Sequence, residues 1–226
     1  LNQSIATMAA AEGCALADVF ALTERIRAVT PFRVNGTTFI KSGHPENPPH
    51  YLFAKDGFHP ATLAQAHFAN AIVTAINAKW SQAIPAISNR GMLEDVLGLD
   101  PDQPLRDWLV ANGVASGGFF DDADGDGLAN GMEFALGSNP AGSDAPDRFV
   151  TTGLRAGVPS LILRYPGTST RDGYLIAGAE ESSTLPGAWS AVPPSRTASL
   201  PGGEFEAWRP ITGTSGFLRL AARPAP

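Results

Sequence analysis

The chain has 226 residues, enough for one large domain or for two or three small ones. Charged residues make up 17% and apolar residues 43%, so the chain can bury a core, and disorder throughout is excluded. The net charge is −6, and the acidic excess lies in residues 81–142, which hold two basic and ten acidic groups. This concentration favours an acidic linker or a cation site, and the lack of a basic stripe argues against nucleic acid as a partner.

The first thirty residues predict a helix at 2–12 and then a short buried strand at 14–20 that runs into a helical turn at 21–28. Cys14 is the single cysteine, so no internal disulfide can form, and its apolar neighbours favour a place in the core. Residues 30–55 contain four prolines and two glycines and are predicted to be an irregular loop. No apolar stretch reaches the ~20 residues that a membrane-spanning helix needs.

A long helix is predicted over Ala61–Trp80, because Phe68, Ile72 and Ile76 recur every fourth residue. Pro60 keeps the residue before it out of the helical region and is itself favoured in a first helical turn. The helix is expected to expose a large apolar stripe, and a stripe of that kind usually marks a missing partner surface.

Asp56 and His59 lie three residues apart directly before this helix. A carboxylate at that distance can orient and charge-balance an imidazole, which then acts as a general base. The alternative is that Asp56 caps the helix while His59 is an ordinary surface residue.

The segment 56–61, Asp-Gly-Phe-His-Pro-Ala, resembles the last signature block of SGNH (GDSL) hydrolases, and residues 1–80 are similar to the end of that domain. The resemblance implies a three-layer α/β fold, with Asp56 as the orienting acid and His59 as the base of a serine ester hydrolase. No Gly-Asp-Ser nucleophile segment and no Gly-x-Asn-Asp oxyanion segment occurs in the sequence. The expectation is therefore that the N-terminal part of the hydrolase domain is missing, and that these residues alone are inactive.

Residues 81–103 are predicted to be a linker, and residues 104–142 a calcium-binding, EF-hand-like segment that begins with a helix at 104–112. The segment 122–133 fits the D-x-D-x-D-G-x5-E pattern of a calcium loop at every position. Ca²⁺ takes six to eight oxygen ligands, so alternate carboxylates can converge on it. The alternative is an acidic, solvated turn. The predicted ligands are Asp122, Asp124, Asp126, the Leu128 carbonyl, Asn130 and Glu133.

The flanks of this loop lack a complete entering helix, because Ser116-Gly117-Gly118 interrupts the approach. The segment instead resembles the thrombospondin type 3-like and dockerin-like calcium loops of secreted bacterial proteins. One loop is present where dockerins need two, so a calcium-stiffened joint is expected rather than cohesin binding. Calcium modules of ~0.1–1 mM affinity suit a calcium-rich compartment, so a secreted or cell-surface location is expected.

Residues 143–226 alternate apolar residues with turns and predict an antiparallel β-sandwich module. The expected strands are 160–165, 174–179, 188–192, 204–208 and 217–221. The fold class is therefore multidomain: a truncated α/β segment over residues 1–80, a linker, a small calcium-loop joint and an all-β sandwich. The region resembles the β modules that end many secreted bacterial hydrolases, in which the aromatic residues are core or form a sugar-stacking platform.

Two functions follow from these observations. The first is the C-terminal part of a secreted serine ester hydrolase, acting on an ester substrate for which an acylated polysaccharide is favoured. The second is a non-catalytic, calcium-dependent adhesion or scaffold protein in which the Asp56–His59 spacing is incidental.

Overall fold

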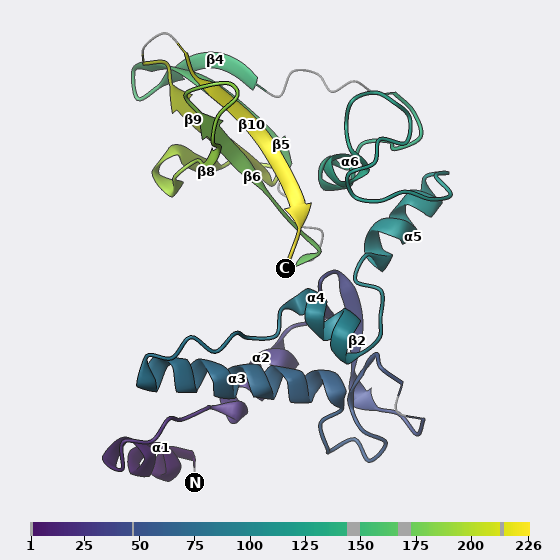
Figure 1. Ribbon diagram of the computed structural model, residues 1–226, viewed down its shortest axis with the longest axis vertical. Helices are drawn as coiled ribbons and strands as arrows, with labels where there is room; N and C mark the ends of the chain where they lie inside the picture. Colours follow the sequence, from purple (N-terminus) through teal and green to yellow (C-terminus); the bar gives the residue numbers. More distant parts are fainter. Residues whose placement is uncertain (1, 47, 144–149, 167–172, 213–214) are drawn as a thin grey trace. The chain divides into compact units, whose positions relative to one another are not determined.

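The structure is a computed structural model, and it describes residues 2–46, 48–143, 150–166, 173–212 and 215–226 (Figure 1). The chain divides into two compact units, Leu1–Pro101 and Asp102–Ala225. The calcium-loop segment and the β-rich region, which the sequence predicts as separate parts, belong to the same unit.

The helices of the first unit are α1 (Asn2–Ala11), α2 (Val19–Ala28), α3 (Thr62–Trp80), α4 (Asn89–Gly91) and the π-helical turn η1 (Met92–Val96). Three of them, α1, α2 and α3, begin close to where the sequence predicts them, whereas α4 and η1 lie in the predicted linker. A cap residue explains the start of α2. Asp18 accepts a hydrogen bond from the backbone N–H of Ala21 at 2.8 Å, which fixes the first turn of the second helix. The segment 14–18 that leads into this helix is not a strand, so that prediction was wrong. Cys14 is exposed rather than part of the core, because no described strand pairs with its segment.

Three short strands lie in the stretch predicted as an irregular loop. β1 (Phe32–Val34) pairs antiparallel with β2 (Thr37–Gly43), and β2 pairs parallel with β3 (Tyr51–Phe53). The connection between β1 and β2 is Asn35-Gly36, with φ of 46° and 77°. Positive φ at both positions is typical of the tight turns of β-hairpins, in which Asn-Gly is favoured. The loop prediction was therefore wrong for β1 to β3.

The core of the first unit forms where α3 meets the small sheet and η1. Met92 and Leu93 are at most 1% exposed, so part of the predicted linker 81–103 is packed into this core. Of the apolar row on α3, Ile72 is 48% exposed and lies in solvent as expected, whereas Phe68 and Ile76 are partly buried. The core residues are Val34, Phe39, Leu52, Leu63, Ala64, Ala66, Met92 and Leu93.

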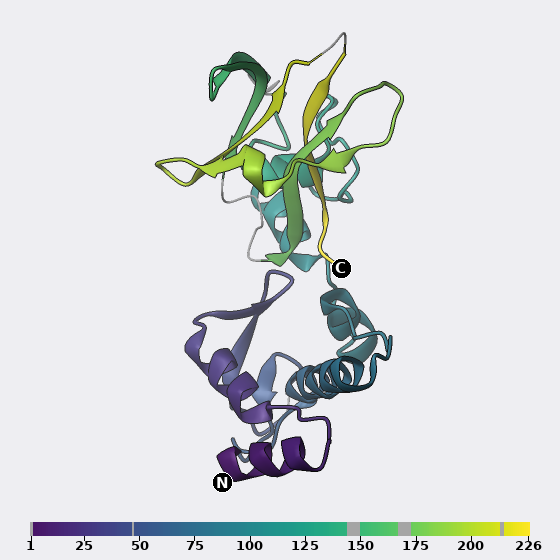
Figure 2. The same ribbon diagram turned by 90° about the vertical axis from the view of Figure 1, so that its left-hand side faces the viewer.

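In its described residues, the second unit combines two α-helices and the short helix η3 (Pro194–Arg196) with two antiparallel sheets (Figures 1 and 2). The helices are α5 (Gln103–Ala111) and α6 (Asn130–Leu136), which flank the acidic loop. One sheet has the order β4-β5-β9-β8, with β4 Val150–Arg155, β5 Val158–Pro166, β9 Glu204–Pro210 and β8 Thr197–Ser199. The other has the order β10-β6-β7, with β10 Phe217–Pro224, β6 Leu175–Ser182 and β7 Ser190–Ala191.

Two apolar clusters hold this unit together. Leu163 on β5, Ala179 on β6 and Leu218 on β10 belong to a cluster that includes side chains of both sheets. The second cluster packs α5 and α6 against Tyr174 and Leu175. Leu175 is the first residue of β6, and Tyr174 directly precedes it. The loop between the two helices is thus anchored to the sheets.

The molecule therefore combines helices with antiparallel sheets, and its C-terminal part is rich in sheet, as the sequence predicts. Among the described residues, no helix is long and apolar enough to cross a membrane.

Candidate functional site

The segment between β3 and α3 holds Asp56 and His59 in one tight turn. Gly57 has a φ of 69°, and its N–H donates to the Ala54 carbonyl at 2.8 Å, while the Ala54 N–H donates to the His59 carbonyl at 2.8 Å. The backbone N–H groups of Phe58 and His59 both donate to Oδ1 of Asp56 at 2.9 Å. These bonds fix the carboxylate relative to the backbone that carries the imidazole.

The second carboxylate oxygen, Asp56 Oδ2, lies 2.5 Å from His59 Nδ1, so the predicted hydrogen bond is present. The hydrogen bond to His59, followed by those from the Phe58 and His59 N–H groups, holds the pKa of the Asp56 carboxyl far below its usual range. The N-cap of α3 is Ala61, which has no side-chain cap, so Asp56 does not cap this helix. The His59 side chain is 72% exposed, and its Nε2 makes no hydrogen bond within the described residues.

A cavity of about 400 Å³ opens beside this turn, with Phe58 and Pro60 in its wall. Lys41 also lines it, and its ammonium donates to the carbonyls of Arg27 and Val29 at 2.7 and 2.6 Å, at the C-terminal end of α2. The rest of the wall is largely apolar. No serine lines the cavity within the described residues. Within the described residues, the structure therefore places an acid and a base together without a serine in the wall of the adjacent cavity. The remaining lining residues are Thr23, Ile26, Arg27, Leu52, Phe53, Gly57, Ala64 and Phe68.

The other three histidines have aromatic neighbours. The ring of His44 lies 5.0 Å from that of Tyr51, and the ring of His50 lies 6.0 Å from that of Phe39. His67 lies edge-on to Phe32, and burial lowers the pKa of its imidazole. These contacts give each of them a packing role.

The acidic loop of the second unit gathers three of its predicted ligands. Carboxylate oxygens of Asp122, Asp124 and Asp126 lie within 4.8 Å of one another. Asp122 is oriented by two backbone donors, since Gly125 N–H reaches its Oδ1 and Gly127 N–H reaches its Oδ2, both at 2.9 Å. Oδ2 of Asp124 and Oδ2 of Asp126 are buried without a hydrogen-bond partner in the described part of the chain. Three close aspartates of this kind can hold a metal ion.

The other predicted ligands occupy different places. Asn130 is fully buried, and its carboxamide accepts from Ala123 N–H at 3.3 Å and donates to the Gly118 carbonyl at 3.0 Å, so it closes the loop. Glu133 is fully buried on α6 and lies outside the group of carboxylates within 4.8 Å. The backbone N–H of Leu128 donates to Asp126 Oδ1 at 2.8 Å, which leaves the Leu128 carbonyl as its candidate ligand atom.

Sequence reasoning missed two paired glutamates of the second unit, of which Glu206 is buried and Glu181 is partly buried. Glu206 on β9 has a side chain 5% exposed and pairs with Arg155 on β4 and Arg164 on β5. The hydrogen bonds from Arg155, and secondly from Arg164, lower the pKa of the Glu206 carboxyl. Glu181 pairs with Arg196 and Arg209. The partners are up to 51 residues apart in the sequence, so no local pattern could indicate these pairs.

Comparison with protein-family models, with curated proteins and with solved structures finds no significant match to this chain.

Proposed function

We propose that Asp56 and His59 are the acid and base of a serine ester hydrolase. The observation that carries this proposal is the 2.5 Å contact between Asp56 Oδ2 and His59 Nδ1, with the rest of the ring exposed. The carboxylate holds the imidazole in the tautomer that has its proton on Nδ1, so Nε2 can accept a proton.

In the proposed reaction, Nε2 of His59 takes the proton of a serine hydroxyl as the serine attacks the ester carbonyl. The same nitrogen then gives the proton to the leaving alcohol, and Asp56 balances the positive charge that the ring carries in between. In this proposal the serine and the oxyanion donors are not supplied by these 226 residues, since no Gly-Asp-Ser or Gly-x-Asn-Asp segment occurs in the sequence.

The proposed substrate is an ester, and an acylated polysaccharide is favoured because an appended β-rich unit suits a polymeric substrate. The apolar cavity beside the Asp56–His59 turn supports an ester with an apolar acyl group. The proposed location is secreted or at the surface of a bacterial cell, because a calcium loop of this type functions where calcium is abundant.

A fluorophosphonate probe tests the proposal, because it labels an activated serine covalently. The protein made from the complete coding sequence that contains these residues should be labelled, and the labelled serine should lie in a Gly-Asp-Ser segment. His59→Gln should abolish labelling, whereas His50→Gln should not. A complete protein that is not labelled would overturn the proposal.

We further propose that the acidic loop binds one Ca²⁺ through Asp122, Asp124, Asp126, the Leu128 carbonyl, Asn130 and Glu133. The buried carboxylate oxygens of Asp124 and Asp126 support it, because a cation would offset the cost of their burial. Glu133 must move toward the aspartates or ligate through water for the full set to form.

The second candidate function is a calcium-dependent adhesion or scaffold protein without catalysis. The clustering of Asp122, Asp124 and Asp126 is compatible with this function and with a hydrolase alike, since a bound ion would stiffen the second unit in either case. The fluorophosphonate experiment distinguishes the two candidates. A scaffold protein would bind calcium but would not be labelled by the probe.

A further inference from the structure

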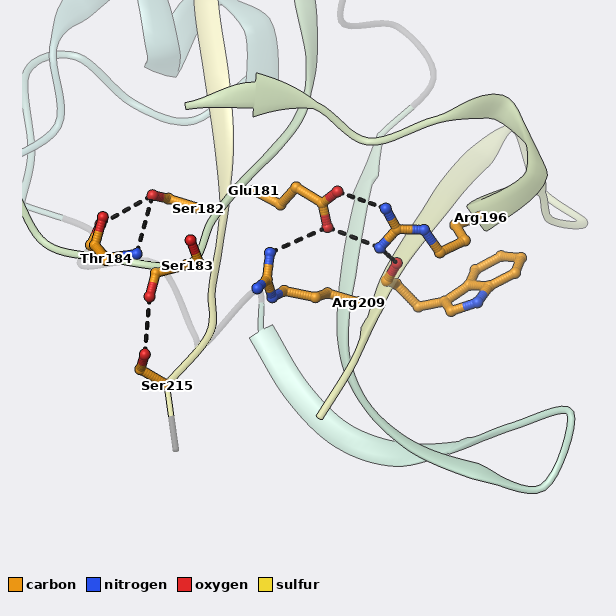
Figure 3. A network of polar contacts seen from close by, with 8 residues as sticks. Glu181, Ser182, Ser183, Thr184, Arg196, Arg209 and Ser215 are labelled. Atoms are coloured by element: carbon orange, nitrogen blue, oxygen red, sulfur yellow. Dashed lines mark hydrogen bonds and ion pairs between the residues drawn. The ribbon is translucent and has the colours of Figure 1, made fainter. Parts of the chain in front are cut away.

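The sheet β10-β6-β7 carries a shallow groove on the face that points away from the core. Side chains alternate between the two faces of a sheet, and Ala179 of β6 lies in the core. Glu181 points to the same side as Ala179, toward two arginines (Figure 3). Gly178 and Glu180 therefore point outward, and together with outward residues of β10 they line a groove of about 290 Å³.

Small residues form the floor of this groove. Gly178 pairs with Ala221 of β10, and a Cβ on Gly178 would meet no atom beyond its chain neighbours within 4 Å. Arg219 and Arg223 lie two residues to either side of Ala221. Their Cα atoms are therefore roughly 13 Å apart on an extended strand. The floor is thus an open step between two guanidinium groups.

Arg219 is held in place, with part of its guanidinium unused. Its Nε and Nη2 donate to Oε2 of Glu180 at 3.1 and 2.7 Å, and its guanidinium lies 4.1 Å from the centre of the Trp189 ring. Within the described residues, Nη1 of Arg219 and Oε1 of Glu180 make no hydrogen bond. The Arg219 side chain is 47% exposed and Oε1 of Glu180 is not buried, so both can meet a ligand.

Arg223 stands at the other end of the groove. It is exposed and makes no hydrogen bond or ion pair with any residue that the structure describes. Ile176, its partner across the two strands, is 43% exposed and adds apolar surface. Two arginines and one glutamate line the groove, which leaves it one positive charge. The groove therefore favours an anion, although the whole chain is acidic.

The groups that line the groove favour an acidic sugar over a phosphate polymer. The guanidinium of Arg223 matches the two oxygens of a carboxylate. Arg219 Nη1 and Glu180 Oε1 offer a donor and an acceptor on one ion pair, which suits neighbouring hydroxyl groups, whereas the Glu180 carboxylate would repel a phosphate. No aromatic side chain lines the groove within the described residues, so a nucleic-acid base has no ring on which to stack.

We propose that this groove binds a uronic acid unit of an acidic polysaccharide. Arg223 binds the carboxylate of the sugar, while Arg219 and Glu180 hold two of its hydroxyl groups. The ring lies on the floor formed by Gly178 and Ala221. A side chain larger than that of alanine at either floor position would occupy the place of the ring.

Isothermal calorimetry on the whole chain tests the proposal with three probes: trigalacturonate, neutral maltotriose and a thymidine oligonucleotide. Trigalacturonate is expected to bind with a Kd on the order of 1 mM, as is usual for a small ligand in an open groove. Maltotriose should bind at least about tenfold more weakly, because it has no carboxylate for Arg223. The oligonucleotide should bind no better than maltotriose. The groove contains no residue of the Asp56–His59 turn or of the acidic loop, so the result is independent of the proposed hydrolase and calcium functions.

Two variants localise the binding. Arg223→Gln should weaken trigalacturonate binding about tenfold or more, because a charge-assisted hydrogen bond is lost. Gly178→Val leaves every charge in place and should weaken binding similarly by filling the floor. Its melting temperature should not fall, because valine is favoured in strands and the Cβ has open space. The control is Arg25→Gln, which removes an exposed arginine of α2 and should bind as the wild type does.

Three results would overturn the proposal. The first is no binding of trigalacturonate at roughly 20 mM, well above the expected Kd. The second is binding of maltotriose or of the oligonucleotide as tight as that of trigalacturonate. The third is unchanged affinity in either Arg223→Gln or Gly178→Val.

Discussion

Asp56 is held by three hydrogen bonds, of which only one comes from a side chain. His59→Ala removes the side-chain bond and leaves the two backbone N–H donors in place. We expect the pKa of the Asp56 carboxyl to rise toward its ordinary value of 3.8 without reaching it, because the backbone donors still favour the ionised form. Carboxyl carbon NMR shifts followed against pH measure this change.

The matched control for that titration is His44→Ala, which removes a histidine that does not contact Asp56. It should leave the Asp56 titration unchanged. Equal titration curves in wild type and His59→Ala would show that the two side chains do not interact in solution.

Gly131, next to Asn130 at the end of the acidic loop, packs closely against Phe119. A Cβ at this position would lie 2.3 Å from the Phe119 ring, and the Gly131 N–H donates to the Phe119 carbonyl at 2.8 Å. Gly131→Ala is therefore expected to destabilise the second unit by about 1–3 kcal/mol, the usual cost of overpacking. Urea denaturation measures the free energy of unfolding.

Gly118→Ala serves as the control, since its Cβ would meet Asp121 at 3.4 Å, an ordinary contact. This variant should stay within about 0.5 kcal/mol of the wild type, as surface substitutions usually do. Equal free energies of unfolding for Gly131→Ala and Gly118→Ala would contradict the packing of Phe119 on Gly131.

At the scale of elements, helices were easier to predict than short strands. The fourfold spacing of apolar residues gave α3 to within one residue, because a long amphipathic helix repeats its signal over several turns. β1, β2 and β3 were missed, although Asn35-Gly36 was a local hairpin signal. Prolines and glycines around them suggested a loop. β1 and β3 have three residues each and carry too little alternation to outweigh that, and the two large apolar residues of β2, Phe39 and Ile40, are adjacent rather than alternating.

The candidate sites show the same contrast between local signals, which the sequence reveals, and contacts that only the folded chain creates. Asp56 and His59 could be predicted to meet because they are three residues apart, and the three aspartates because they alternate within one loop. The pairing of Glu181 could not be predicted, because its partners Arg196 and Arg209 lie 15 and 28 residues away and only the folded chain brings them together.

The acidic loop makes a second prediction at the element scale, that Ca²⁺ stabilises the second unit. At one hundred times the Kd, binding to the folded state alone contributes about 2.7 kcal/mol, which raises the melting temperature of a unit of this size by roughly 10 °C. Mg²⁺ should have a much smaller effect, because it retains its waters and requires a tighter octahedron. Differential scanning calorimetry on chelator-treated protein measures the shift.

Glu133→Gln should remove most of this calcium effect, since the substitution takes away one ligand charge. Asp121→Asn is the control, because Asp121 lies just outside the loop pattern and accepts a hydrogen bond from Gly118 N–H instead. No shift with millimolar Ca²⁺ in the wild type would contradict the proposed site.

At the scale of the whole molecule, the two units have separate cores and should respond differently to acid. The pKa of Glu181 is lowered by Arg196, and that of Glu206 by Arg155, from an ordinary value of 4.5. A lowered pKa in the folded state contributes stability above the unfolded value, and this contribution is lost as the pH falls below about 4.5. The melting temperature of the second unit should therefore fall between pH 5 and pH 3.

Glu206→Gln should flatten this acid dependence and should cost roughly 1.5–3 kcal/mol at neutral pH, because two charge-assisted pairs are lost. The exposed Glu204 on the same strand provides the control variant Glu204→Gln, which should retain the full acid dependence. An unchanged profile in Glu206→Gln would show that the buried pairs do not govern the acid response.

The most direct test of the proposed hydrolase is a comparison of kcat/KM for p-nitrophenyl acetate in the complete protein that contains these residues. His59→Gln is expected to lower kcat/KM roughly 10⁴-fold or more, and Asp56→Asn to a similar or smaller extent, as the corresponding changes do in serine hydrolases. His50→Gln should stay close to wild type. A His59→Gln variant that keeps the wild-type kcat/KM would contradict the assignment of His59 as the catalytic base.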